Sequence, residues 1–262
     1  MRIAISTYAV RDLFRGGKLT PVDFPAFVRD TFGVDAAEYN DFFFPEYPPV
    51  PDADLDAVRA AGDAAGVEAV AWSVGGSFID DDEAKRAANI EMAAKQIRCA
   101  GRLGVKFNRI DLGSFKDESR YATDAVGRCI AAYEQLIPLA TELGVRLCIE
   151  NHGGLSGNPE YVRRIREAVG PEHVGYMLDL GNFTRGQDRY GLIEQMAPAC
   201  FVLHAKTHNF TDDGEERDID YARCFGILKD AGFAGICTVE YEGKEDQVDG
   251  TAKTIDLIRK HG

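Results

Sequence analysis

The sequence predicts an α/β fold of the (β/α)8 barrel type, in which parallel strands alternate with helices. Eight short β-rich runs alternate with longer stretches of helical period over 262 residues, which is about the length of such a barrel. The tripeptides Ala-Gly-Val and Leu-Gly-Val recur at the expected helix-to-strand junctions, at 65–67, 103–105 and 143–145. No linker-like change in composition and no low-complexity segment divides the chain, so we expect a single domain over residues 1–262.

The predicted strands are short runs rich in β-branched and other apolar residues. They cover residues 2–7, 34–39, 67–72, 105–110, 145–150, 173–179, 200–206 and 235–241. Amphipathic stretches between them open near Asp and close at Gly, as capped helices do. Helices are predicted in this way over 52–66, 82–104 and 124–144.

An open, doubly wound sheet is the alternative fold, and it would also place its site at the carboxyl ends of the strands. Such sheets usually have fewer strands, and no Gly-x-Gly-x-x-Gly follows the first predicted strand. The segment RGGKLTP at 15–21 lacks the spacing of a phosphate-binding loop and is interpreted as flexible. These observations favour the barrel.

Charge and composition restrict the classes of function. Forty-three acidic against 30 basic residues give a formal net charge of -13, which disfavours nucleic-acid and membrane-surface partners. No stretch approaches the roughly 20 apolar residues of a membrane span, and residues 1–10 lack the features of a signal peptide. The six cysteines are scattered and are interpreted as reduced and structural. We therefore expect a cytoplasmic protein that acts on a small molecule.

Four consecutive predicted strands end in a side chain that can bind a metal ion. These side chains are Glu150, Asp179, His204 and Glu240. Side chains alternate along a strand, and on three of these four strands the face opposite the polar group is the bulkier or more apolar one. The four polar groups should therefore point towards the barrel axis, at the strand ends where this fold carries its active sites.

Three carboxylates at one place would raise one another's pKa unless a cation neutralised them. Singly, each residue has an ordinary interpretation as a hydrogen-bonding or capping group, but the set on consecutive strands favours a metal site. The predicted ligands are Glu150, Asp179, His204 and Glu240. Three oxygens and one nitrogen favour one Mn²⁺ or Mg²⁺ ion and remain compatible with Co²⁺ or Zn²⁺.

Three further residues of the second half are candidates for contact with a substrate. Lys206 shares a face with His204 and would bring a positive charge to an enolate oxygen or an anionic group, or it would pair with an excess carboxylate. His152 has the parity of Glu150 and is a candidate substrate ligand or proton shuttle, with a structural role in the loop as the alternative. His208 continues the face of His204 beyond the strand.

The candidates of the first half are Glu38, Trp72 and Arg109. Glu38 is predicted to bind sugar hydroxyls, with pairing to a basic residue as the alternative. Trp72, the single tryptophan, would stack on a sugar or pack in the core, and Arg109 would bind an anionic group or form a structural ion pair. The aromatic run at 39–49 indicates a lid over the pocket or a subunit contact, which leaves a homo-oligomer open.

The motifs IENHGG, LDLGNF, HAKTHNF and GICTVEYEG resemble those of the xylose-isomerase-like TIM-barrel superfamily. That superfamily includes sugar and sugar-phosphate isomerases and epimerases, inosose and 3-dehydroshikimate dehydratases, and the endonuclease IV group. The resemblance covers the whole chain in layout, with its specific motifs in the second half. It implies the same fourfold metal site, the two glutamates as an acid/base pair, and substrate contacts from Lys206 and His152.

One position departs from many of these relatives. The epimerases and endonucleases commonly carry a histidine three residues after the aspartate, where this chain has Asn182. A trinuclear zinc cluster is hard to assemble from the five histidines of the sequence, and the net charge of -13 disfavours DNA. We therefore do not expect an endonuclease.

The chemistry expected of such a site is proton transfer next to a carbonyl. A divalent ion would polarise an α-hydroxycarbonyl substrate and stabilise the enediolate, while Glu150 and Glu240 on opposite sides of its plane would move the proton. This predicts an isomerase or epimerase of a sugar or sugar phosphate. If a hydroxyl group lay β to the deprotonated carbon, the enzyme would be a dehydratase of a keto-cyclitol or of 3-dehydroshikimate. A non-catalytic binding protein is disfavoured, because it would not need paired acid/base carboxylates.

Overall fold

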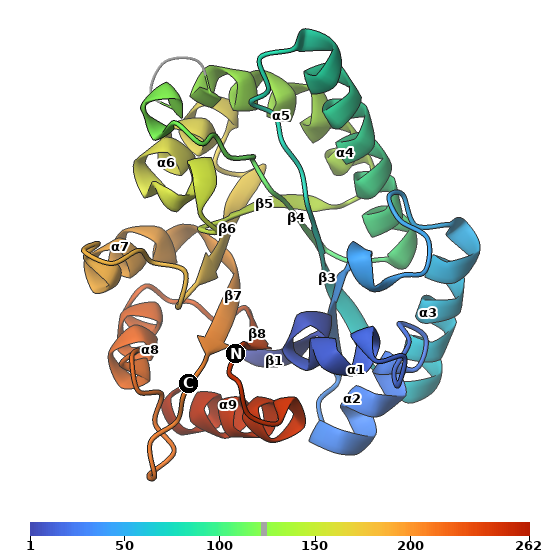
Figure 1. The fold of residues 1–262 in the computed structure, drawn as a ribbon, viewed down its shortest axis with the longest axis vertical. Helices are drawn as coiled ribbons and strands as arrows, with labels where there is room; N and C mark the ends of the chain where they lie inside the picture. The colour runs from blue at the N-terminus through green and yellow to red at the C-terminus, as the bar shows by residue number, and fades with distance from the viewer. Residues whose placement is uncertain (122–124) are drawn as a thin grey trace.

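The computed structural model describes residues 1–121 and 125–262, and its strands close into one parallel barrel (Figure 1). The strands are β1 (Arg2–Ser6), β2 (Ala36–Asn40), β3 (Glu68–Val74), β4 (Phe107–Ile110), β5 (Arg146–Glu150), β6 (Val174–Asp179), β7 (Cys200–Thr207) and β8 (Ile236–Tyr241). Each strand pairs with its neighbours in the chain, and β8 pairs with β1. This closure confirms the predicted (β/α)8 barrel and rules out the open sheet.

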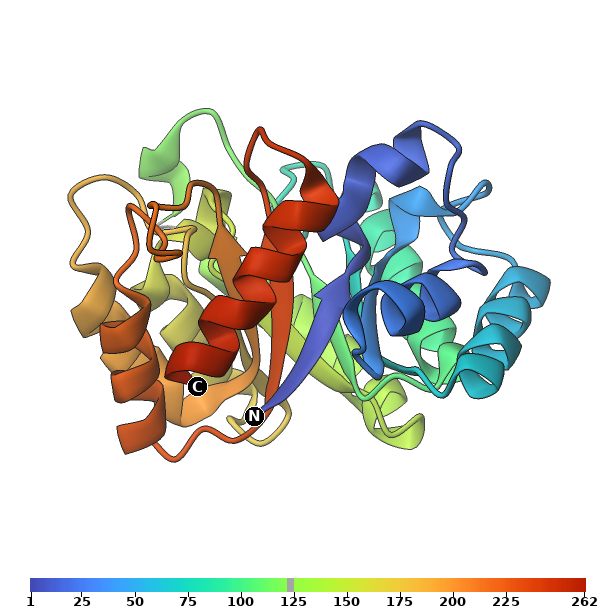
Figure 2. The same cartoon turned by 90° about the horizontal axis from the view of Figure 1, so that it is seen from below.

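Helices surround the barrel on the outside (Figures 1 and 2). They are α1 (Arg11–Arg15), α2 (Phe24–Phe32), α3 (Asp52–Ala65), α4 (Glu83–Leu103), α5 (Ala125–Glu142), α6 (Pro159–Val169), α7 (Arg189–Met196), α8 (Tyr221–Asp230) and α9 (Gln247–His261). Short 3-10 helices are η1 (Thr7–Val10), η2 (Asp41–Phe43), η3 (Glu118–Tyr121), η4 (Gly154–Gly157) and η5 (Ala197–Ala199). The three helices named from the sequence are α3, α4 and α5, although the predicted start at Asp124 lies outside the described residues.

Local capping explains why these helices could be located from the sequence. The side chain of Asp82 accepts hydrogen bonds from the backbone N–H groups of Ala84 and Lys85 at the start of α4. Gly66 ends α3 and Gly104 ends α4, with positive φ angles of 64° and 83° that favour glycine. The Leu-Gly-Val and Ala-Gly-Val junctions are therefore helix ends followed directly by strands.

The core has two layers. Side chains of β3 to β7 meet inside the barrel, in a cluster made of Ala71, Phe107, Cys148, Met177 and Val202. A larger cluster lies between the strands and the helices. Cys148, Met177 and Val202 each precede one of the predicted ligands by two residues, so the alternation of side chains directs those ligands into the barrel as well.

Figure 2 shows the loops at the carboxyl ends of the strands along its upper edge and both termini along its lower edge. All six cysteines are free and five of them are buried, as expected for structural cysteines. Within the described ranges, no helix combines the length and the apolar character that crossing a membrane requires.

Candidate metal centre

The four side chains predicted from the strand ends meet at one place inside the mouth of the barrel. One ligand-type atom from each of them lies within 4.8 Å of the others, in the set Glu150, Asp179, His204 and Glu240. All four residues are buried. We call this set the ligand cluster.

Four buried polar atoms of the ligand cluster, one from each residue, make no hydrogen bond of good geometry. These atoms are Glu150 Oε2, Asp179 Oδ2, His204 Nδ1 and Glu240 Oε2. The three carboxylate oxygens each lie 3.0–3.2 Å from a nitrogen of Arg109 or Lys206, and buried carboxylates crowded in this way favour a shared cation. Carboxylate oxygens and an imidazole nitrogen are suitable ligands for a divalent metal ion, and the residues present therefore fit one.

A buried ammonium group lies beside two of these oxygens. Lys206 Nζ is 3.1 Å from Asp179 Oδ2 and 3.0 Å from Glu240 Oε2. It is also 2.8 Å from both Glu242 Oε1 and Asn182 Oδ1. Burial disfavours its charge, but the surrounding carboxylates, Asp179 first, raise the pKa of Lys206 above its ordinary value. The structure thus shows the pairing with carboxylates that was one interpretation of this lysine.

Arg109 forms a structural ion pair, which was the alternative to its predicted role in binding an anionic group. Its Nε is 3.2 Å from Glu150 Oε2, and its Nη1 is 2.5 Å from Asp111 Oδ1. Burial alone would raise the pKa of Glu150, but Arg109 and His204 outweigh that effect and lower it to about 2. Glu150 is therefore ionised at neutral pH.

The pKa of Asp179 is shifted in the opposite direction to that of Glu150. Burial raises the pKa of Asp179 to about 7 even though Lys206 lies beside it, and the charges of Glu240 and Glu150 add to the increase. Glu240 differs because Lys206 and His204 overcome its burial and hold its pKa well below the usual range. A divalent cation would relieve the repulsion among these three carboxylates.

Asn151 explains why a buried strand runs on into polar residues. Its side-chain Nδ2 donates to the backbone carbonyl of Asp179 at 2.9 Å, and its Oδ1 accepts from the backbone N–H of Asp179 at 2.8 Å. The amide thereby ties the end of β5 to the end of β6 and fixes the spacing of Glu150 and Asp179. Sequence reasoning missed this role, although an amide directly after a predicted ligand was a signal for it.

Asn182, in the loop after β6, contacts Lys206 and a residue of the ligand cluster. Its Nδ2 donates to Glu150 Oε1 at 3.2 Å, and its Oδ1 accepts the bond from Lys206. Backbone N–H groups of Gly181 and Asn182 bind the other carboxylate oxygen, Oδ1, of Asp179 at 2.6 and 2.9 Å. This loop therefore occupies Oδ1 of Asp179, while Oδ2 faces Lys206 and the other residues of the ligand cluster.

Glu38 lies in the barrel interior and contacts His204, and its predicted contact with sugar hydroxyls stays a prediction. Both of its carboxylate oxygens are 3.0 Å from His204 Nε2, and Ser73 Oγ donates to one of them at 2.7 Å. The side chain is 0% exposed. Its predicted alternative, pairing with a basic residue, is what the structure shows, with His204 as the partner.

Trp72 packs in the core, which was the alternative to its predicted role in stacking on a sugar. It is fully buried, its Nε1 donates to Gln96 Oε1 of α4 at 3.0 Å, and its ring meets the edge of Phe44. The register between β2 and β3 shifts near Glu38. Beyond this irregularity Ser73 points into the barrel towards Glu38, and Trp72 next to it points out to the helices.

Two histidines lie at the mouth of the barrel. His152 Nδ1 is 3.5 Å from Asp111 Oδ1, and this contact raises the pKa of His152 although burial opposes it. Both residues line a pocket of about 230 Å³ between the loops after β4 and β5. His208 is partly exposed and its Nε2 is 3.9 Å from Glu242 Oε2.

The aromatic run after β2 is divided between core and surface. Phe44 is buried, whereas Phe42 and Tyr47 are exposed. Phe42 and Phe43 pack against Tyr8, which follows β1. Part of this run therefore forms a rim at the ends of β1 and β2, and its role as a lid or subunit contact stays a prediction.

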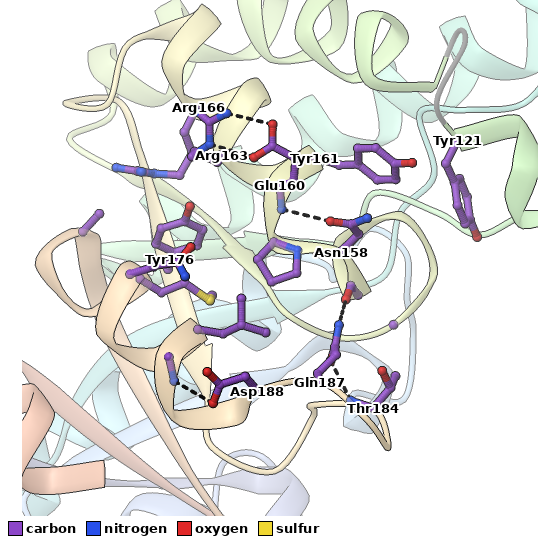
Figure 3. Close-up of a pocket in the computed structure, with 18 of the residues that line it drawn as sticks. Tyr121, Asn158, Glu160, Tyr161, Arg163, Arg166, Tyr176, Thr184, Gln187 and Asp188 are labelled. Carbon is purple, nitrogen blue, oxygen red and sulfur yellow. Dashed lines mark hydrogen bonds and ion pairs between the residues drawn. The ribbon is translucent and has the colours of Figure 1, made fainter. Parts of the chain in front are cut away.

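A larger pocket, of about 840 Å³, lies away from the ligand cluster (Figure 3). Residues of α6, α7 and the loops that precede them form it, including Asn158, Tyr161, Gln187 and Asp188. Its charged groups are largely paired with each other, as in the ion pair between Arg163 and a glutamate one helical turn away. None of the four residues of the ligand cluster lines it.

Comparisons with known proteins agree with the barrel fold. A model of the family described as xylose isomerase-like TIM barrel matches residues 26–261. No curated protein matches the sequence.

Similar solved structures include the IolI protein with a bound zinc atom, at TM-score 0.78, 18% identity and coverage of 100% of this chain and 99% of that one. L-ribulose 3-epimerase is similar at TM-score 0.77 and 18% identity, with coverage of 99% of this chain and 94% of that one. The 3-keto-D-glucoside 4-epimerase YcjR from E. coli is similar at TM-score 0.76 and 14% identity, with coverage of 99% of both chains. At these identities the likeness shows the fold.

Proposed function

The chain belongs to the xylose isomerase-like TIM-barrel family, and we propose that it is a divalent-metal-dependent isomerase or epimerase of sugars or sugar phosphates. The observation that carries the proposal is the convergence of four buried ligand-type side chains from consecutive strands. Sugar epimerases are among the proteins with a similar fold, which supports this substrate class. The activity would belong to carbohydrate metabolism.

The proposed ion is Mn²⁺ or Mg²⁺, with Co²⁺ and Zn²⁺ as alternatives. Bound by the ligand cluster, it would polarise the carbonyl of an α-hydroxycarbonyl substrate and so favour loss of the neighbouring proton. The IolI structure holds a zinc atom, which supports a metal in this fold without fixing its identity here.

The charges around the cluster support a divalent ion. Carboxylates outnumber the permanent cations around the cluster. The carboxylates are Glu38, Asp111, Glu150, Asp179, Glu240 and Glu242, and the cations are Arg109 and Lys206. Negative charge stays in excess even with His204 protonated, and a divalent cation would offset part of it. Uncompensated charge is costly in a buried site, so this excess favours the metal-loaded state.

Glu150 and Glu240 are the proposed acid/base pair. They belong to β5 and β8 and approach the cluster from different sides of the barrel. In the proposed reaction, one carboxylate removes the proton from the carbon next to the carbonyl and the other returns a proton. Return to the opposite face of that carbon gives epimerisation, and return to the neighbouring carbon gives isomerisation.

Other residues would hold the substrate and the developing charge. Lys206 lies beside Glu240 and would donate a hydrogen bond to the enediolate oxygen. His152 and His208, at the mouth, would bind substrate hydroxyls. Arg109 would keep Glu150 ionised rather than contact the substrate, because two carboxylates already occupy its guanidinium group.

A dehydratase of a keto-cyclitol or of 3-dehydroshikimate is the second candidate. The contact with Asp111 raises the pKa of His152 at the mouth of the barrel. In a dehydratase this imidazole would protonate the leaving hydroxyl group.

Proton NMR in D₂O distinguishes the two reactions. The enzyme is loaded with Mn²⁺, stripped with EDTA and reloaded with Mg²⁺, and is then incubated with ketoses, ketose phosphates, keto-inositols and 3-dehydroshikimate. Metal-dependent deuterium incorporation without loss of water is expected, and it should disappear in Glu240→Gln. New olefinic or enol signals would instead identify the lyase.

A matched variant, Glu242→Gln, controls for the loss of a carboxylate near Lys206, because Glu242 does not belong to the ligand cluster. It should retain measurable exchange. If wild-type protein bound no metal and exchanged no proton with any of these compounds, the proposed function would be wrong.

A further inference from the structure

We propose that Glu38 is a positioning residue that holds His204 in the orientation and tautomer needed to bind the metal through Nδ1. The inference rests on the proposed metal site and deepens it. It assigns Glu38 a task that neither substrate contact nor proton transfer requires. The metal ligands all come from β5 to β8, whereas Glu38 belongs to β2.

The two nitrogen atoms of His204 face different groups. Nε2 is 3.0 Å from Oε1 and 3.0 Å from Oε2 of Glu38. On the other edge of the ring, Nδ1 is 3.3 Å from Glu150 Oε1, 3.7 Å from Glu240 Oε2 and 3.9 Å from Asp179 Oδ2. The imidazole thus lies between Glu38 and the carboxylates of the ligand cluster.

This arrangement determines where the proton of a neutral imidazole resides. An ionised carboxylate only accepts hydrogen bonds, and a neutral imidazole carries one N–H. Nε2 makes the shorter contact, 3.0 Å to Glu38 against 3.3 Å from Nδ1 to Glu150. A neutral imidazole would therefore carry its proton on Nε2, with the lone pair of Nδ1 directed at the ligand cluster. Metal-binding histidines commonly donate their second ring N–H to such an acceptor, which fixes the ring and raises its basicity as a ligand.

Glu38 is itself fixed in place. Ser73 Oγ donates to its Oε1 at 2.7 Å, and neither the carboxylate of Glu38 nor the ring of His204 has access to solvent, with side-chain exposures of 0% and 1%. β1 and β8 separate β2 from β7 around the barrel, so the contact crosses the barrel interior rather than joining adjacent strands. A substrate at the mouth would meet the ligand cluster before it could reach Glu38.

The wild-type protein alone provides the first test. Protein labelled with ¹⁵N-histidine is loaded with diamagnetic Zn²⁺, and two-bond ¹H–¹⁵N spectra identify the protonated and the metal-bound nitrogen of His204. We expect a slowly exchanging proton on Nε2 and zinc on Nδ1. A zinc ion on Nε2, or an Nε2 without a proton, would overturn the proposal.

Three variants provide the second test, read out as Mn²⁺ affinity by calorimetry. Glu38→Leu removes the acceptor and should weaken Mn²⁺ binding about 10- to 100-fold, the usual effect of losing an outer-shell partner. Glu38→Gln keeps an amide oxygen that can accept from Nε2–H. It should therefore lose only as much affinity as Glu242→Gln, which removes one nearby carboxylate that does not touch His204.

The outcomes separate this inference from the proposed function. If Glu38→Leu binds Mn²⁺ no more weakly than Glu242→Gln, the effect of Glu38 is one of charge only and the positioning role is wrong. If Glu38→Leu does not fold, the wild-type spectra and Glu38→Gln still decide. Absence of metal binding in wild-type protein would instead remove the metal site itself.

Discussion

The strands β5 to β8 each contribute one residue to the ligand cluster, whereas the strands β1 to β4 contribute none. The first half of the barrel instead supplies groups that contact the ligands from behind. Glu38 of β2 holds His204, Ser73 of β3 holds Glu38, and Arg109 of β4 pairs with Glu150. Both halves are therefore needed for the site, but only the second half would touch the metal.

This difference separates two uses of buried charge. In the second half, carboxylates converge beyond what the local cations neutralise, which is a strained arrangement unless an ion binds. In the first half, the charged groups that contact the ligand cluster have defined partners, because Glu38 faces His204 and Arg109 lies between Glu150 and Asp111. Variants of the two halves should therefore have different defects. Variants of the second half should lose metal affinity, and variants of the first half should lose stability or ligand geometry.

The largest effect is expected from a ligand of the second half. Asp179→Asn keeps the size of the side chain and leaves the backbone clasp from Asn151 intact, but it removes a charged metal ligand. Mn²⁺ affinity, measured by calorimetry, should fall by more than the roughly 100-fold upper limit typical of outer-shell partners. The matched control is Asp41→Asn, an isosteric change of a buried carboxylate outside the cluster, and it should bind Mn²⁺ as the wild type does. Retention of affinity within about tenfold by Asp179→Asn would contradict the ligand assignment.

The next largest effect is expected from an ion pair of the first half. Arg109→Met removes the cation that faces Glu150 and leaves the charge of that carboxylate buried. Breaking a buried pair in this way should lower the free energy of unfolding of the metal-free protein by about 3–5 kcal/mol, measured by urea denaturation in EDTA.

The control for Arg109 is Arg163→Met. Arg163 also pairs with two carboxylates, Glu160 and Glu167, but on the surface of α6. Because solvent screens exposed pairs, this variant should lose much less stability than Arg109→Met. Equal losses in the two variants would show that Glu150 does not depend on Arg109 for its charge.

The fold and the ligand cluster could be predicted because their signals are local. Strand and helix periods, Asp at helix starts and Gly at helix ends are readable within about 20 residues. Once a barrel is inferred, its strand ends must converge. The side-chain alternation that links Glu150 to Cys148, or Asp179 to Met177, then decides which groups point inward.

The supporting residues could not be predicted because their contacts are not local. Glu38 and His204 are 166 residues apart in the chain and meet across the barrel. The alternation of side chains along the strand indicated that Glu38 points into the barrel. It did not indicate how far from the mouth Glu38 lies, so the sequence did not distinguish a residue that contacts the ligands from one that contacts the substrate. The direction in which Trp72 points depends on the shift in register between β2 and β3, and no residue type in that segment predicts such a shift.

The smallest effect is expected at Asp41, a buried carboxylate of the first half whose side-chain partner is an amide. Its Oδ2 accepts from Gln96 Nε2 at 2.7 Å, and Gln96 in turn accepts from Trp72. Burial raises the pKa of Asp41 to about 6, despite the opposing effect of its hydrogen bonds and of Arg109. Because this pKa is raised on folding, the stability that Asp41 contributes is present below about pH 4 and is lost as the pH rises through about 6.

Asp41→Asn should remove that pH dependence. Above about pH 7 the variant should be more stable to urea than the wild type by up to about 3 kcal/mol, because it no longer buries a charge. The difference should shrink as the pH falls and vanish near pH 4, where the wild-type carboxylate is protonated in the native state. A difference that stays constant over this range would mean that Asp41 is not a strained carboxylate. Buried charge without a facing cation would then be tolerated in the first half of the barrel, and the contrast with the second half would lie in metal binding alone.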